Sequence, residues 1–325
     1  MVIAWCGRCS TAFRCHRIDV LSPMPATHSD GLRPSLPELI ALRDRVHGWP
    51  PAQRGAATVA GPAQSPFRGR GMEYAESRPY TPGDDSRHID WRLTARSGKP
   101  HTKLFQAERE RVTLIIADTN PTLYFGTRVR YKSVQAARAG AIAAWAAQGR
   151  GDRIGALRGS RSEPPVAPAG GRRGVLRALD ALVRWYAQPP AQDSGLDHAL
   201  ATAARTLHPG ASLVVLSDAQ SFALVPQGRL AALATHHDLL AVMLTDPLEM
   251  QPPRDRLPFA LDDARIELDL DSAVGRTRWR HAFADVLHNQ THRLVGMGAR
   301  VRTLRSDDGV NALLASLLSQ RRVAA

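Results

Sequence analysis

Beyond Arg111 the chain alternates strand-length apolar runs with segments of helical periodicity, and this alternation restricts its fold more than any other feature. The predicted strands are VTLIIAD, RIGALRG, ASLVVLSD, DLLAVMLTD and ARVRTLR, at 112–118, 153–159, 211–218, 238–246 and 299–305, and the first of them is a continuous apolar run. Strands that are apolar throughout are covered on both faces, and helices between them connect parallel neighbours. We therefore predict a doubly wound α/β domain with a mainly parallel sheet over residues 111–322.

Helical segments fill the intervals between these runs. Their periodicity predicts helices at 133–150, 174–190, 196–210, 227–237 and 310–320, and one long helix from Thr277 to Leu294. Ser133 is expected to cap the first of them, with Ile142 and Trp145 facing the core. A further strand, ARIELDLD, is expected at 264–271.

Residues 1–34 are expected to be disordered or to form an extension. Cys6, Cys9 and Cys15 all precede Met24, and the rest of the chain has no cysteine, which indicates a reducing compartment. These cysteines could serve as a redox dithiol or, together with His16, as a zinc knuckle. We favour an upstream extension with Met24 as the working start.

Residues 35–66 are predicted to form a helix and a linker. Ser35 and Glu38 have the spacing of a capping box, and Leu39, Ile40 and Val46 recur on one side of the helix that follows. The segment 50–71 is rich in proline, glycine and alanine and has no periodicity, so it is expected to be a loose connection.

The net charge of +13 raises nucleic acid as a partner. The chain has three lysines, however, and its arginines are scattered instead of gathering beside aromatic residues. A nucleic-acid-binding accessory protein therefore stays an alternative. No stretch reaches the ~20 apolar residues that span a bilayer, and the N-terminus lacks the apolar core of a secretory signal, so a cytoplasmic location is expected.

Oxygen-bearing side chains follow the predicted strands. Asp118, Asn120 and Thr122 alternate directly after the first strand, Asp218 closes the strand at 211–218, and Ser194 stands at the head of a helix. In a doubly wound sheet, ligands bind beyond the carboxyl ends of the strands. Oxygens spaced in this way suit a hard cation such as Mg²⁺.

The stretch RPYTPGDDSRHIDWRLTAR, at 78–96, lies in a β-rich element predicted over 67–110. Pro82 and Gly83 indicate a turn, and Tyr80, Ile89 and Trp91 alternate as a strand would. We predict a β-hairpin held onto the α/β domain by an Arg/Asp network that also presents a partner-facing surface. The charged members of that network are Arg78, Asp84, Asp85, Arg87 and Asp90.

Two sets of residues resemble known families. Asp118, Asn120, Thr122, Ser194 and Asp218 resemble the metal-ion-dependent adhesion site of von Willebrand factor type A domains, with Asn120 in place of the usual serine. GMEYAESRPYTPGDDSRHIDWRLTAR followed by KLFQAERER resembles the signature of bacterial "domain of unknown function 58" proteins, as do TDPLEMQPP and GARVRTLRSDDGVNALLASL. The resemblance covers about 67–318 and implies a von Willebrand A-like, Rossmann-like fold.

The resemblance also implies a function. Such proteins are expected to be non-enzymatic interaction modules that bind a protein partner, with Mg²⁺ leaving one position for a carboxylate of the partner. The implied companion is an AAA+ ATPase of the MoxR type, which assists assembly or maturation of other proteins. A metal-dependent phosphodiesterase that uses Asp84, Asp85, Asp90 and Asp118 is the enzymatic alternative, which the residue pattern supports poorly.

Overall fold

The computed structural model describes residues 30–48, 72–82, 84–107, 111–190, 193–261 and 264–318. The three cysteines, Met24, the connection at 49–71 and Gly83 lie outside these ranges. The described residues fall into two compact units. One is the segment 72–107, and the other joins 30–48 to 111–318.

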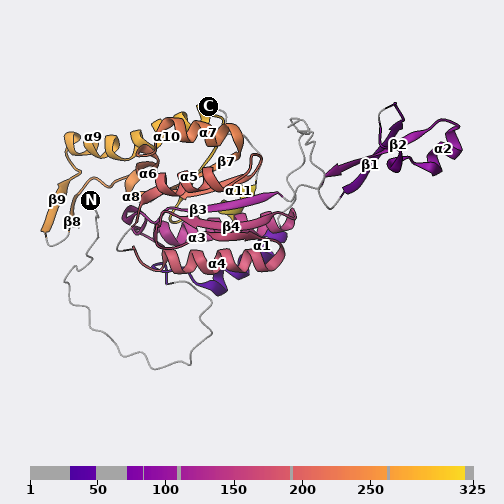
Figure 1. Ribbon diagram of the computed structural model, residues 1–325. Helices are drawn as coiled ribbons and strands as arrows, with labels where there is room; N and C mark the ends of the chain where they lie inside the picture. The colour runs from indigo at the N-terminus through magenta and orange to yellow at the C-terminus, as the bar shows by residue number, and fades with distance from the viewer. Residues whose placement is uncertain are drawn as a thin grey trace, which may run out of the picture. The chain divides into compact units, whose positions relative to one another are not determined.

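The larger unit is built on a six-stranded sheet (Figure 1). Its strand order is β10–β7–β6–β3–β4–β5, and all neighbours are parallel except β4 and β5. The predicted doubly wound, mainly parallel α/β fold is confirmed. The strands are β3 (Val112–Ala117), β4 (Arg153–Arg158), β5 (Val166–Ala169), β6 (Ser212–Ser217), β7 (Asp238–Thr245) and β10 (Arg300–Arg305).

Helices cover both faces of this sheet because its strands are apolar on both sides. Ile115 of β3 packs on one face, whereas its neighbours Leu114 and Ile116 pack on the other. The first face carries α1 (Leu36–His47), α3 (Lys132–Gly149), α4 (Gly171–Tyr186) and α11 (Val310–Leu318). The second carries α5 (Gly195–Thr206), α6 (Ala219–Ala223), α7 (Gln227–His236) and α10 (Ala284–Gly296).

Several helix ends differ from the prediction. Tyr131, not Ser133, precedes α3, and Ser133 is buried in the first turn. Ser35 does cap α1 by accepting a hydrogen bond from the Glu38 backbone N–H, but Ile40 is exposed. The long helix predicted from Thr277 to Leu294 is two helices, α9 (Ala273–Ala282) and α10, which meet at Phe283.

The insertion after β7 forms a small layer of its own. The predicted strand at 264–271 is β9 (Ala264–Asp269), which pairs with β8 (Arg256–Leu261) in an antiparallel hairpin instead of joining the main sheet. A short helix, α8 (Pro247–Met250), comes before it. Phe259, Leu270 and Trp279 form the buried core of this layer.

The smaller unit is the predicted β-hairpin, made of β1 (Met72–Pro79) and β2 (His101–Ala107). Between the strands lie η1 (Ser86–His88) and α2 (Trp91–Ser97). Trp91 was predicted to lie in a strand, but it begins a helix because Asp90 caps α2. Ile89 keeps an antiparallel bridge to Thr102.

One ion pair of the predicted network is present in this unit: Arg78 Nη2 lies 2.6 Å from Asp84 Oδ1. Asp85 accepts a hydrogen bond from the Arg87 backbone N–H at 3.0 Å. Asp90 accepts one from the Leu93 backbone N–H at 3.1 Å. These aspartates thus stabilise the turn and the helix starts. The Tyr80 hydroxyl donates to the carbonyl oxygen of Asp84.

Within the parts of the chain that the structure describes, no helix combines the length and apolar character needed to cross a membrane.

Candidate functional site

The candidate site lies where the sheet changes winding direction. β4 and β6 flank β3 on opposite sides. The chain leaves the carboxyl end of β3 toward β4 and the carboxyl end of β6 toward β7, so these two connections run in opposite directions along the sheet. Asp118 follows β3 and Asp218 follows β6, and the two carboxylates are 1% and 3% exposed. The Ser217 hydroxyl donates to Asp118 Oδ2 at 2.5 Å, and the Asn120 backbone N–H donates to Oδ1.

Thr122 joins the two strand ends. Its Oγ1 lies 2.7 Å from Asp218 Oδ2 and 3.0 Å from Asn120 Oδ1. Asn120 also accepts a hydrogen bond from the Thr122 backbone N–H, which caps the short helix η2 (Pro121–Leu123). The structure thus brings together Asp118, Asn120, Thr122 and Asp218, four of the five residues predicted as metal ligands.

Ser194, the fifth predicted ligand, is placed differently. It is exposed at the start of α5, and among the described residues its side chain makes no hydrogen bond to the other four. The neighbouring residue, Asp193, makes the link instead, since its Oδ2 accepts a hydrogen bond from the Thr119 hydroxyl. Asp193 Oδ1 also accepts from the Gly195 backbone N–H, so this carboxylate fixes the start of α5 against the β3 loop.

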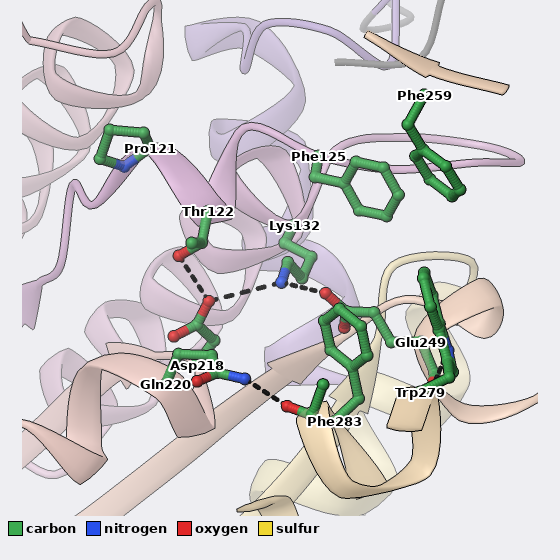
Figure 2. A pocket seen from close by; sticks show the side chains of 11 residues that line it. Pro121, Thr122, Phe125, Lys132, Asp218, Gln220, Glu249, Phe259, Trp279 and Phe283 are labelled. Atoms are coloured by element: carbon green, nitrogen blue, oxygen red, sulfur yellow. Dashed lines mark hydrogen bonds and ion pairs between the residues drawn. The ribbon is translucent and has the colours of Figure 1, made fainter. Parts of the chain in front are cut away.

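Lys132 and Glu249 complete the site, and the sequence analysis missed both. Lys132 Nζ lies 2.6 Å from Glu249 Oε1 and 3.4 Å from Asp218 Oδ2 (Figure 2). Lys132 is 2% exposed. Two signals in the sequence point to this pair: Lys132 is one of three lysines in an arginine-rich chain, and Glu249 stands three residues after Asp246, the spacing of a capping box.

The carboxylates outnumber the ammonium group. Burial, together with the nearby charge of Asp218, raises the pKa of Asp118 to about 6. Burial also raises the pKa of Glu249 despite its contact with Lys132. For Lys132, burial favours the neutral amine, but Glu249 and Asp218 outweigh it and raise the pKa, so the ammonium persists. One cation therefore faces three buried carboxylates.

A cavity of about 310 Å³ opens beside these groups. Figure 2 shows Lys132 between Asp218 and Glu249 at one end, with aromatic rings around the rest. The rings belong to Phe125, Phe259, Trp279 and Phe283.

The inserted layer holds this cavity in shape. The ring centroids of Trp279 and Phe283 are 4.6 Å apart, and those of Phe259 and Trp279 are 5.8 Å apart. Trp279 Nε1 donates to the carbonyl oxygen of Glu249 at 3.1 Å, which ties α9 to the residue that binds Lys132. Gln220 donates a hydrogen bond to the Ala282 carbonyl oxygen across the same cavity.

The donor set suits a divalent cation in two respects. Carboxylate, amide and hydroxyl oxygens are the ligands that Mg²⁺ prefers, and the strand ends supply all three. A divalent ion would also offset the two negative charges that Lys132 leaves uncompensated. Considering histidine, cysteine, aspartate and glutamate alone, no group of three or more in the described ranges is placed to hold a metal, so a cation here would depend on Asn120 and Thr122.

Residues 76–293 match the family described as "Protein of unknown function DUF58". An uncharacterized protein of Mycobacterium tuberculosis and one of Mycobacterium bovis are each 31% identical to the chain over 265 residues, which cover 78% of this chain and 81% of the relative.

One solved structure is also similar. A crystal structure of an aerotolerance-related membrane protein from Bacteroides fragilis covers 63% of this chain and 96% of its own, at 14% identity and a TM-score of 0.38. Such a low score supports no conclusion about this protein.

Proposed function

This chain belongs to the DUF58 family, and we propose that it is a non-enzymatic module that binds a protein partner at the carboxyl edge of its sheet. The partner that family resemblance implies is an AAA+ ATPase of the MoxR type, acting in assembly or maturation of other proteins. The proposal rests on one observation. An aromatic cavity lies beside a buried cluster in which the carboxylates outnumber the one ammonium group, at the point where the sheet changes winding direction.

The cavity suits a protein partner. About 310 Å³ is at the lower end of the ~300–1,000 Å³ typical of small-molecule sites, which leaves room for one large apolar side chain. Interfaces concentrate their binding energy in such recesses, where an anchor side chain is fully desolvated. The rings of Phe125 and Phe283 are half-buried, so they present apolar surface to an incoming group.

In this proposal Mg²⁺ supports the contact. Asp118, Asn120, Thr122 and Asp218 would hold the ion, which supplies a Lewis-acidic position for a carboxylate of the partner. The chain's own groups keep the cluster in place: Lys132 holds Asp218 and Glu249, and Ser217 holds Asp118.

A binding role accords with the polar groups that line the cavity. Its lining residues include no serine, cysteine or histidine, and the carboxylates that line it, Asp218 and Glu249, are held by Lys132. Lys132 is held as an ammonium by two carboxylates, which makes it a poor general base.

The proposal is tested by measuring the affinity of the full chain for the MoxR-type ATPase of the same organism. Phe125→Ala and Thr122→Ala should each weaken binding by about tenfold or more, which corresponds to about 1.4 kcal/mol. Leu176→Ala is the matched control, because Leu176 is an exposed apolar residue of α4, outside the cavity. Equal affinities for all four proteins would contradict the proposal.

A further inference from the structure

The hairpin unit carries an exposed surface that the proposed site does not use. Trp91 is 70% exposed at the first position of α2, which is unusual for so large an apolar side chain. Exposed aromatic side chains of this size are enriched where proteins bind partners.

Local caps fix this tryptophan in place. Asp90 caps the start of α2, and Gly98, with a φ of 70°, ends it in the left-handed conformation that favours glycine. The Thr94 hydroxyl oxygen accepts a hydrogen bond from the His101 backbone N–H, which holds α2 against β2. The exposed position of Trp91 therefore follows from a capped helix tied to the hairpin.

Basic side chains surround Trp91 in the sequence and on α2. Arg92 and Arg96 are one helical turn apart, so they share a face of α2, and Lys99 follows directly after the helix. Arg87 lies on the preceding short helix. All four are exposed, and within the described part of the chain none of them forms an ion pair.

Asp84 and Asp90, two acidic residues close to α2, are engaged by local partners. Asp84 accepts from Arg78 and from the Thr81 backbone N–H, and Asp90 accepts from the Ser77 hydroxyl as well as from its own helix. The described surface around α2 therefore combines the exposed ring of Trp91 with the exposed cationic groups of Arg87, Arg92, Arg96 and Lys99.

We propose that this surface, made of Arg87, Trp91, Arg92, Arg96 and Lys99, docks an acidic segment of a protein partner that includes a large apolar side chain. The arginines on one face of α2 would bind carboxylates of that segment, and Trp91 would pack on its apolar residue. Charge complementarity also raises nucleic acid as a ligand. Single-strand binding surfaces, however, stack successive bases on several aromatic rings, whereas this surface offers one tryptophan with aspartates close to it in sequence.

The inference does not rest on the site at the sheet edge, and it can be tested without the ATPase. The probe is a fluorescein-labelled peptide of glutamate, phenylalanine and glycine, followed by fluorescence anisotropy with the full-length protein. The same peptide with lysine for glutamate is the charge control, and a labelled oligothymidylate tests the nucleic-acid alternative.

The acidic peptide should bind wild-type protein, and both Trp91→Ala and the double substitution Arg92→Glu with Arg96→Glu should weaken it by about tenfold or more. Arg172→Glu is the matched control, since Arg172 is an exposed arginine of α4 in the other unit. All of these residues are exposed, so the variants should unfold at the wild-type temperature.

Three results would overturn the inference. The first is tighter binding of oligothymidylate than of the acidic peptide, with the same variants affected. The second is binding of the acidic peptide that these variants leave unchanged. The third is the absence of binding to either probe.

Discussion

Asp118→Asn should stabilise the metal-free protein at neutral pH, although it replaces a hydrogen-bonded residue of the candidate site. Asp118 is buried, and its pKa is raised from 3.8 to about 6. At about 1.36 kcal/mol per pKa unit, keeping this carboxylate ionised in the folded state costs about 3 kcal/mol. Asparagine removes the charge with little change in shape.

The substituted side chain can keep most of the local contacts. The asparagine carbonyl can accept from the Asn120 backbone N–H, and the Ser217 hydroxyl can turn to accept from the new amide. Allowing for an imperfect exchange of these hydrogen bonds, we expect the free energy of unfolding at pH 7.5 to rise by about 1–3 kcal/mol.

The size of this effect depends on pH. Below the unfolded-state pKa of 3.8 the carboxyl is protonated in both states and carries no penalty. As the pH rises from there to about 6, the unfolded chain loses the proton while the folded chain retains it, so wild-type stability falls. Above that range the penalty is constant, so the advantage of Asp118→Asn should appear between about pH 4 and 6 and then level off.

Urea unfolding in the presence of a chelator measures this effect. Wild-type protein and Asp118→Asn are compared at a series of pH values, so that the titration of groups distant from Asp118 cancels in the difference. A variant less stable than wild type at pH 7.5, or a difference that does not change with pH, would refute the assignment of Asp118 as a carboxylate buried at the expense of stability.

Further substitutions separate the parts of the site. Lys132→Met should lower the free energy of unfolding by about 3–5 kcal/mol, because it leaves Asp218 and Glu249 buried without their cation. A loss below about 1 kcal/mol in urea unfolding would contradict the buried ion pair. Ser194→Ala should change stability by less than about 0.5 kcal/mol, since its side chain is exposed. Asp193→Ala should cost about 1–3 kcal/mol, because it removes the acceptor of two hydrogen bonds. Equal melting temperatures for these two alanine variants would be the contrary result.

The architecture follows from local patterns because each element of the main sheet carries its own signal. Apart from Thr113 and residues at their ends, the runs that became β3, β6 and β7 are apolar, and this composition is typical of a strand covered on both faces. Two carboxylates at the ends of adjacent parallel strands must then share one edge, which is why Asp118 and Asp218 could be placed together in advance.

What the sequence could not reveal depends on contacts between distant segments. Lys132 and Glu249 are 117 positions apart, and they meet because α3 starts at the edge where β7 ends. The helical period of 277–294 continues across Phe283, but the backbone there has φ −122° and ψ −65°, and the chain divides into α9 and α10. Ser194 matched a ligand position by order along the chain, whereas the link to the β3 loop comes from Asp193.

The most direct measurement is the affinity of the MoxR-type ATPase for wild-type protein and for Asp118→Asn, each in Mg²⁺ and in chelator. We predict that wild-type protein binds at least about tenfold more tightly in Mg²⁺, and that folded Asp118→Asn binds weakly in both conditions. If the two proteins bind equally well with and without Mg²⁺, the sheet edge is not a cation-supported docking site.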